Sequence, residues 1–96
     1  MVQLNNTWWV YLVKCADDSL YCGVTIDTDR RVSEHNVDNK KGAKYTKTRR
    51  PVELVFRRKC ESRKDACQQE YQIKQLTRKK KLSLVASFSN NTEEYA

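Results

Sequence analysis

Two strand candidates joined by a short polar turn constrain the fold of this 96-residue chain more than any other feature. The stretch WVYLVKCADDSLYCG occupies residues 9–23, and the runs 8–15 and 20–25 are rich in Trp, Val, Tyr, Leu and Ile. Such residues favour β-strands, and the intervening ADDS is typical of a hairpin turn. The sequence therefore predicts an antiparallel hairpin near its beginning.

One helix and a long loop follow the hairpin. Asp27 and Thr28 are N-cap candidates, and no Pro or Gly occurs between them and Gly42, which favours a helix over residues 28–37. The polar, basic stretch that continues to residue 51 predicts a loop of a length that is usually functional or mobile.

A third strand and two further helices complete the predicted order. Pro51 precedes the apolar run VELVFRRK, which predicts a strand over residues 52–59. Ser62 begins a capping-box pattern, so we expect a helix over residues 62–76 and a second helix over residues 78–86. The predicted order is β-β-α-β-α-α, an α/β chain of the α+β type.

Length and composition predict one small domain. A chain of this size forms a single domain, which we place at residues 8–86 between an N-terminal tail at 1–7 and a flexible C-terminal tail at 87–96. Apolar runs are only a few residues long, and the N-terminus has neither a basic start nor an apolar segment. We therefore expect no membrane span and no secretion, and a cytoplasmic location.

The charge of the chain points to a polyanionic partner. Nineteen Lys and Arg against twelve Asp and Glu give a net charge of +7, and the basic residues cluster in residues 39–51 and 77–83. Clustering favours a surface that follows phosphates over a generically basic protein, so we expect nucleic acid, and DNA first, as the partner. The predicted contact residues are Lys40, Lys41, Lys44, Tyr45, Lys47, Arg49 and Arg50.

The four cysteines are interpreted as small core residues. Cys15 and Cys22, like Cys60 and Cys67, are separated by six residues, whereas zinc ligands usually stand two to four residues apart. Two disulfides are the alternative, but a chain that is not exported stays reduced. Cys67 is expected on the apolar side of its helix.

The two hairpin tyrosines are expected on one face of the sheet. If Asp17, Asp18 and Ser19 form the turn, Tyr11 lies opposite Thr25 and shares a face with Tyr21 and Gly23. The two phenols are then placed to handle a proton together, although tyrosines also fill sheet positions without any catalytic role. A glycine within a strand predicts a bulge or the close approach of a ligand, which gives Gly23 a structural role.

Three further residues are candidates for chemistry on phosphate. Arg31 and His35 stand four residues apart on the predicted helix, and a guanidinium with an imidazole suits phosphate binding and proton transfer, although a solvated helix face is the alternative. Glu70 falls between Ala66 and Cys67 on the apolar side of the next helix. Its carboxylate needs a partner there, either Lys74 one turn on or a hard cation such as Mg²⁺ or Mn²⁺.

Taken together, these residues resemble the GIY-YIG nucleases, and most closely the small stand-alone bacterial proteins of that family. The resemblance covers roughly residues 8–86. The matching segments are WVY at 9–11, YCG at 21–23, TDRRVSEHN at 28–36, KGAKYTKTRRPVELV at 41–55 and EYQIKQL at 70–76.

The resemblance implies a central three-stranded antiparallel sheet flanked by helices, and divalent-metal-dependent cleavage of phosphodiester bonds in DNA maintenance or repair. It implies that Tyr11 and Tyr21 line the active site, one of them helping to deprotonate the attacking water. Arg31 would bind the scissile phosphate and His35 would assist proton transfer. Glu70 would hold a single Mg²⁺ or Mn²⁺ ion.

This chain departs from the family pattern at two positions. Trp9 replaces the glycine of the first motif, and Val24 stands where some members carry a lysine. Larger members also attach a DNA-binding domain; we expect none within these 96 residues, and we therefore expect substrate selection to rest on the basic loop or on a partner protein. A nucleic-acid-binding module without catalysis is the main alternative, and an adaptor for an acidic protein is a weaker one.

Overall fold

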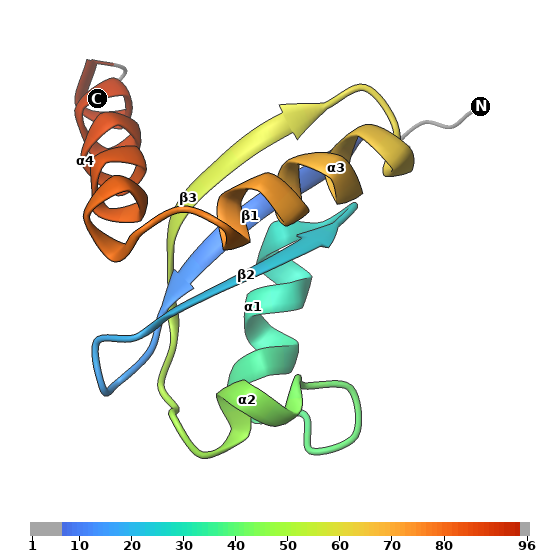
Figure 1. Cartoon of the computed structure of the whole chain (residues 1–96). Coiled ribbons are helices and arrows are strands. Elements are labelled where there is room, and N and C mark those ends of the chain that lie inside the picture. The colour runs from blue at the N-terminus through green and yellow to red at the C-terminus, as the bar shows by residue number, and fades with distance from the viewer. Residues whose placement is uncertain (1–6, 95–96) are drawn as a thin grey trace.

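The computed structural model describes residues 7–94, and the side chains of residues 7–89. Three strands form one antiparallel sheet in the order β2-β1-β3, and helices flank it (Figure 1). This confirms the predicted sheet, while the short helix α2 lies inside the stretch predicted as loop. The elements are β1 Trp8–Lys14, β2 Leu20–Thr25, α1 Thr28–Val37, α2 Lys44–Lys47, β3 Glu53–Cys60, α3 Arg63–Lys74 and α4 Arg78–Glu94.

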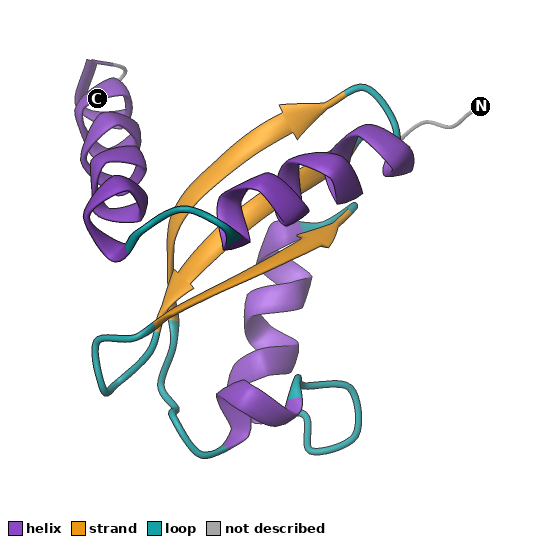
Figure 2. Cartoon of the chain, in the orientation of Figure 1, coloured by secondary structure: helices purple, strands orange, loops and turns teal. Residues whose placement is uncertain are grey.

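The two faces of the sheet are covered by different helices. Alternate side chains of a strand point to opposite faces, so Val10 and Leu12 of β1 pack with residues of α3 and α4, whereas Tyr11 and Val13 face α1. Figure 2 shows α3 on one side of the strands and α1 on the other. The chain therefore has two separate clusters of buried side chains, one on each face.

The hairpin register differs from the sequence-based prediction. Tyr11 pairs with Gly23, not with Thr25, because the turn lies one residue earlier than expected. Asp18 adopts a left-handed conformation with φ of 68°, and Cys15 N–H donates to the Ser19 carbonyl at 2.9 Å. A shift of one residue in the turn moves the pairing by two, so Tyr11 and Tyr21 still share a face.

The helix N-termini are fixed by the residues that the sequence indicates. Helix α1 has the predicted bounds, and its N-cap Asp27 accepts a hydrogen bond from the Arg30 amide at 3.0 Å. Ser62 caps α3 by accepting from the Asp65 amide at 3.0 Å. The Asp65 carboxylate accepts from the Glu61 amide rather than from that of Ser62, which is a variant of the capping box.

Helix α4 is longer than expected. It continues to Glu94, although we predicted its end at residue 86 and a flexible tail beyond. No Pro or Gly follows Arg78 to end it, and Phe88 packs against the core with its ring 6.1 Å from that of Phe56. The predicted N-terminal tail, apart from residue 7, and residues 95–96 lie outside the described residues.

The inward face of α3 corrects the assignment of Cys67. Ala66 and Ile73 are buried, whereas Cys67 is exposed and Tyr71 is 68% exposed. Ala66, Glu70 and Ile73 have the i, i+4, i+7 spacing of one helix face, and this face points inward. Cys67 and Tyr71 lie outside it. The other three cysteines are buried as predicted.

Within residues 7–94, no helix has the length and apolar character that crossing a membrane requires.

Candidate active site

A hydrogen-bonded pair, Tyr11 and His35, forms the centre of the α1 face. The Tyr11 hydroxyl lies 2.8 Å from Nε2 of His35, and these residues are 1% and 0% exposed. Gly23 is directly opposite Tyr11 in the sheet, and a Cβ at this position would stand 2.5 Å from the Tyr11 hydroxyl oxygen. The room that this glycine provides is therefore filled by the Tyr11 ring, and the β1–β2 pairing has no bulge there.

The segment between α1 and β3 encloses the other side of His35. Nδ1 of His35 lies 3.1 Å from Oγ1 of Thr46, and the Ala43 amide approaches the same nitrogen at 3.4 Å. Arg50 donates from Nε to the His35 carbonyl at 2.7 Å. Thr46 is fully buried, and no local pattern distinguishes it from the other polar residues of the basic stretch.

Burial sets the charge state of the central pair. The pKa of His35 falls from 6.5 to about 4, because burial and the positive charges of Arg31 and Arg50 lower it, whereas the negative charge of Glu34 raises it. Burial likewise raises the pKa of Tyr11 to about 12, although the Arg31 guanidinium beside the hydroxyl opposes this. At neutral pH, a neutral imidazole therefore faces a protonated phenol.

Arg31 stands at the border between this buried pair and solvent. Its side chain is 24% exposed and donates from Nη1 to Glu34 Oε1 at 2.9 Å and to the Lys41 carbonyl at 2.7 Å. Glu34 also pairs with Arg30 at 3.6 Å. The i,i+3 spacing from Arg31 to Glu34 is visible in the sequence, but we did not select this carboxylate beforehand.

Tyr21 packs against the same histidine from the edge strand. Its ring meets that of His35 edge-on at 5.3 Å between centroids and stacks on Tyr45 at 5.7 Å. The Arg49 guanidinium lies 3.9 Å from the centroid of the Tyr45 ring. Tyr45 is held by contacts within the chain but is still 38% exposed, so this residue, which was predicted to contact nucleic acid, remains open to solvent.

Glu70 belongs to the other side of the sheet. Its side chain is 24% exposed and pairs with Lys74 at 3.1 Å, the simpler of the two partners that we considered. Partial burial lowers the pKa of Lys74, but the hydrogen bond that Lys74 donates to Glu70 and the charge of that carboxylate raise this pKa overall, with smaller contributions from Cys22 and Tyr21. Strand β2 is an edge strand between the α1 face and the α3 face of the sheet. Its Tyr21 points toward α1, and its Cys22 points toward α3. The structure therefore brings four of the five predicted residues together and leaves Glu70 across this strand.

The donor set around Glu70 suits one kind of cation. No group of three or more His, Cys, Asp or Glu side chains that would hold a metal occurs in the part of the chain that the structure describes. Mg²⁺ commonly binds proteins through one or two carboxylates and takes its other ligands from water and substrate phosphate. A partly exposed single carboxylate fits this pattern, with Lys74 as its partner in the absence of a cation.

The predicted nucleic-acid residues divide into two groups. The side chains of Lys40, Lys41, Lys44 and Lys47 are exposed. Arg50 donates to the His35 carbonyl, to Asn39 Oδ1 at 3.0 Å and to the Asp38 carbonyl at 3.2 Å, and Arg49 binds Asp17 at 3.1 Å and the Tyr45 carbonyl at 2.9 Å. The two arginines therefore hold the segment in place, and the lysines face solvent.

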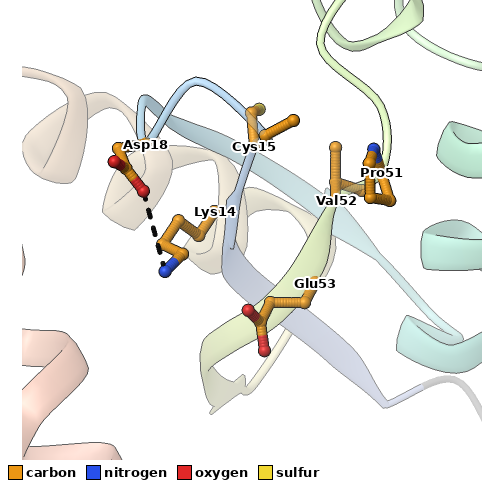
Figure 3. A pocket seen from close by; sticks show the side chains of 7 residues that line it. Lys14, Cys15, Asp18, Pro51, Val52 and Glu53 are labelled. Carbon is orange, nitrogen blue, oxygen red and sulfur yellow. Dashed lines mark ion pairs between the residues drawn. The ribbon is translucent and has the colours of Figure 1, made fainter.

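A small pocket at the hairpin end is separate from these residues. It has a volume of about 240 Å³. Among its lining residues, Lys14 Nζ lies 3.7 Å from Asp18 Oδ1, an ion pair that is dashed in Figure 3. None of the predicted site residues lines it. The lining residues are Lys14, Cys15, Ala16, Asp18, Pro51, Val52 and Glu53.

The model of the GIY-YIG catalytic domain matches residues 7–83 of the chain. A UPF0213 protein of Desulfotalea psychrophila is 51% identical over 78 residues, which are 81% of this chain and 70% of that protein. The UPF0213 protein YazA of Bacillus subtilis is 48% identical over 88 residues, which are 92% of this chain and 87% of that protein.

Two solved structures are similar as well. The solution NMR structure of a UPF0213 protein from Bacillus halodurans has a TM-score of 0.52 and 42% sequence identity, and the match covers 83% of each chain. That of a protein from E. faecalis has a TM-score of 0.58 and 36% identity, and the match covers 90% of this chain and 92% of that one. The observed sheet and helices thus agree with relatives in both sequence and structure.

Proposed function

Because this chain belongs to the GIY-YIG catalytic domain family, a nuclease superfamily, we propose that it is a divalent-metal-dependent nuclease that hydrolyses phosphodiester bonds in DNA. The hydrogen-bonded pair of Tyr11 and His35, with Arg31 beside it, is the observation that carries this proposal. Buried polar groups of this kind cost stability unless they are matched, and they gather where proton transfer is needed.

The central pair provides a route for the proton of the attacking water. Tyr11 takes this proton while its own proton passes to Nε2 of His35, and Tyr21, only partly buried, helps to orient the water. The water oxygen forms a bond to phosphorus, the bond to the leaving oxygen breaks, and the leaving oxygen takes a proton from solvent. Since burial and the charge of Arg31 lower the pKa of His35 and oppose this transfer in the free protein, the negative charge of a phosphate bound at Arg31 has to favour the imidazolium that the transfer produces.

Arg31 is the residue proposed to bind the scissile phosphate. Its guanidinium has donors in a planar fork that matches phosphate oxygens, and its side chain is partly exposed. Glu34 holds it in the free protein, and a phosphate would compete for the same donors. Charge that develops on the phosphoryl oxygens is stabilised by such a positioned cation.

Glu70 is proposed to hold one Mg²⁺ or Mn²⁺ ion. A bound divalent cation would supply Lewis-acid stabilisation of the phosphate oxygens. The exposed lysines, Lys40, Lys41, Lys44 and Lys47, are proposed to follow the DNA backbone, with no discrimination between bases.

Two observations favour a second candidate, a nucleic-acid-binding module without catalysis. Glu70 is paired with Lys74 on the side of the sheet away from Tyr11, and Val24 stands where some relatives of this fold carry a lysine. Incubation with labelled single-stranded, branched and duplex DNA and with RNA, in Mg²⁺, Mn²⁺ or chelator, separates the two functions. Cleavage that requires the cation is expected, and binding without cleavage of any substrate would support the module instead.

Replacement of Glu70 tests the metal assignment. Glu70→Ala is expected to abolish cation-dependent cleavage while DNA affinity stays within a few-fold, because the carboxylate holds the ion and not the phosphate backbone. Lys74→Ala removes the same ion pair but frees the carboxylate, so its cleavage should persist. Glu53→Ala, an exposed carboxylate on β3, is the matched control. Equal losses in the Glu70 and Lys74 variants would make the ion pair structural and remove Glu70 from the mechanism.

A further inference from the structure

We propose that Thr46 is a positioning residue whose hydroxyl holds His35 in the tautomer with its proton on Nδ1, so that Nε2 offers a lone pair to the Tyr11 hydroxyl. The catalytic consequence of this inference rests on the proposed nuclease function. The tautomer itself does not, since it follows from the hydrogen bonds of the free protein.

The hydroxyl of Thr46 has only one proton, and its geometry shows where that proton goes. Oγ1 donates to the Ala43 carbonyl at 2.9 Å, within the turn that begins α2. A hydroxyl keeps two lone pairs after donating its proton. Toward Nδ1 of His35, at 3.1 Å, Thr46 therefore presents an acceptor, and this nitrogen must carry the proton.

The Tyr11 hydroxyl leads to the same tautomer independently. Tyr11 is 1% exposed, so its proton needs an acceptor within the protein. The Arg31 guanidinium beside it can only donate, and Nε2 of His35 at 2.8 Å is the acceptor that the described residues provide. Nε2 therefore carries the lone pair.

One contact favours the opposite tautomer and is weaker. The Ala43 amide lies 3.4 Å from Nδ1 and would donate to it if this nitrogen were unprotonated. That arrangement would place an N–H at Nε2 opposite Tyr11 and leave the buried phenol proton without an acceptor. A buried polar group without a hydrogen-bond partner costs more free energy than a long amide contact returns.

The single histidine of the chain makes this tautomer directly measurable. In protein labelled with ¹⁵N-histidine at pH 7, where His35 is neutral, we expect a pyridine-type ¹⁵N shift for Nε2 and a pyrrole-type shift for Nδ1. The near-isosteric Thr46→Val should move the proton toward Nε2, while Thr46→Ser should keep the wild-type pattern. Thr48→Val, at an exposed threonine two residues on, is the matched control.

Cleavage assays then connect the tautomer with catalysis. Thr46→Val is expected to lower kcat by about tenfold or more, the usual contribution of general acid–base transfer being at least that large, with KM within a few-fold and with rescue by Thr46→Ser. A wild-type spectrum with the proton on Nε2 would overturn the inference, and so would a Thr46→Val spectrum identical to the wild type. If Thr46→Val does not fold, the spectra of the wild type and of Thr46→Ser still test whether the His35 proton is on Nδ1. If the spectra are as expected but the protein cleaves no substrate, the tautomer is supported and only the nuclease proposal fails.

Discussion

The two faces of the sheet are packed by opposite chemical means. Against α3 and α4, the buried residues are apolar, as Val10, Leu12, Phe56 and Ile73 illustrate. Against α1, the buried set includes the hydroxyl of Tyr11 and the imidazole of His35, with apolar contacts from residues such as Val13. The first face gains stability from burial alone, at about 1.5–3 kcal/mol for each large side chain, whereas the second gains it only while its hydrogen bonds are matched.

This difference separates stability from chemistry. A sheet that only had to be stable would tolerate apolar packing on both faces, since each buried polar group brings a desolvation cost. The α1 face carries that cost at the residues that match the family motifs. We infer that the apolar packing under α3 and α4 maintains the fold, while the α1 face carries the residues proposed for proton transfer and phosphate binding, with strand β1 shared between the two and Glu70 across strand β2.

Among the substitutions on the α1 face, removal of the Arg31 guanidinium should have the largest effect, and an unchanged cleavage rate would contradict the division between the two faces. Arg31→Ala is expected to lower kcat/KM by about 10²–10³, the usual consequence of losing one stabilising donor at a reacting centre. Arg30→Ala is the matched control, because this neighbour is exposed and pairs with the same Glu34. The measurement is the cleavage rate of the substrate identified in the panel. Similar rates for the two variants would place the phosphate site elsewhere.

Acid should weaken the α1 face before the α3 and α4 face. The folded pKa of His35 is about 4 against 6.5 in the unfolded chain, so the unfolded state binds more protons between these values. Stability is therefore complete above pH 6.5 and falls as the pH falls toward 4, by on the order of 3 kcal/mol in all. Urea unfolding at pH 7.5, 6.0 and 5.0 measures this loss.

A His35→Gln variant provides the control for the acid effect. It removes the titrating group, so the loss of stability between pH 6.5 and 5 should disappear, whatever the variant's stability at pH 7.5. Asp17, Asp38 and Asp65 have pKa values lowered below 3.8, chiefly by hydrogen bonds, and affect stability only at lower pH. An equal pH dependence in wild type and variant would contradict the burial of a neutral His35.

Much of the fold could be predicted from the sequence because its signals are local. The continuous apolar run of β1, capping by Asp27 and Ser62, and the predicted bounds of α1 follow from neighbouring residues. The end of α4 could not be predicted, because the contact of Phe88 with Phe56 joins segments that are distant in the sequence.

The polar face shows the same limit more strongly. Parity in the hairpin was enough to place Tyr11 and Tyr21 on one side, even though the register was wrong by two residues. Thr46, by contrast, reaches His35 only because the segment from residue 38 to residue 50 folds back on α1, which no local pattern indicates. Glu70 was expected to need a partner, and the sequence left open that this partner is Lys74.

Crowding at Gly23 offers a sharper test of the close packing on the α1 face. In Gly23→Ala, the added methyl would meet the Tyr11 hydroxyl at 2.5 Å and the adjacent ring carbon at 2.7 Å, so the ring has to move away from His35. Overpacking of this kind destabilises by about 1–3 kcal/mol. Urea unfolding gives the stability, and the ¹⁵N shifts of His35 report the lost contact. Ser19→Ala in the exposed turn is the control, and a variant with unchanged histidine shifts would contradict the tight fit.

Neutralised lysines should have the smallest effect, one confined to DNA binding. Lys44→Gln with Lys47→Gln removes two exposed charges from α2, beside the α1 face, and should weaken binding of all sequences by a few-fold. The slope of log K against log salt should fall by about two, one for each lost phosphate contact. Lys64→Gln with Lys79→Gln removes the same charge from α3 and α4, two exposed positions on the other side of the sheet, so net charge alone predicts identical slopes for the two double variants. A difference between them would assign the phosphate contacts to the side of the sheet that carries Tyr11 and His35, whereas identical slopes would mean that only the overall charge attracts DNA.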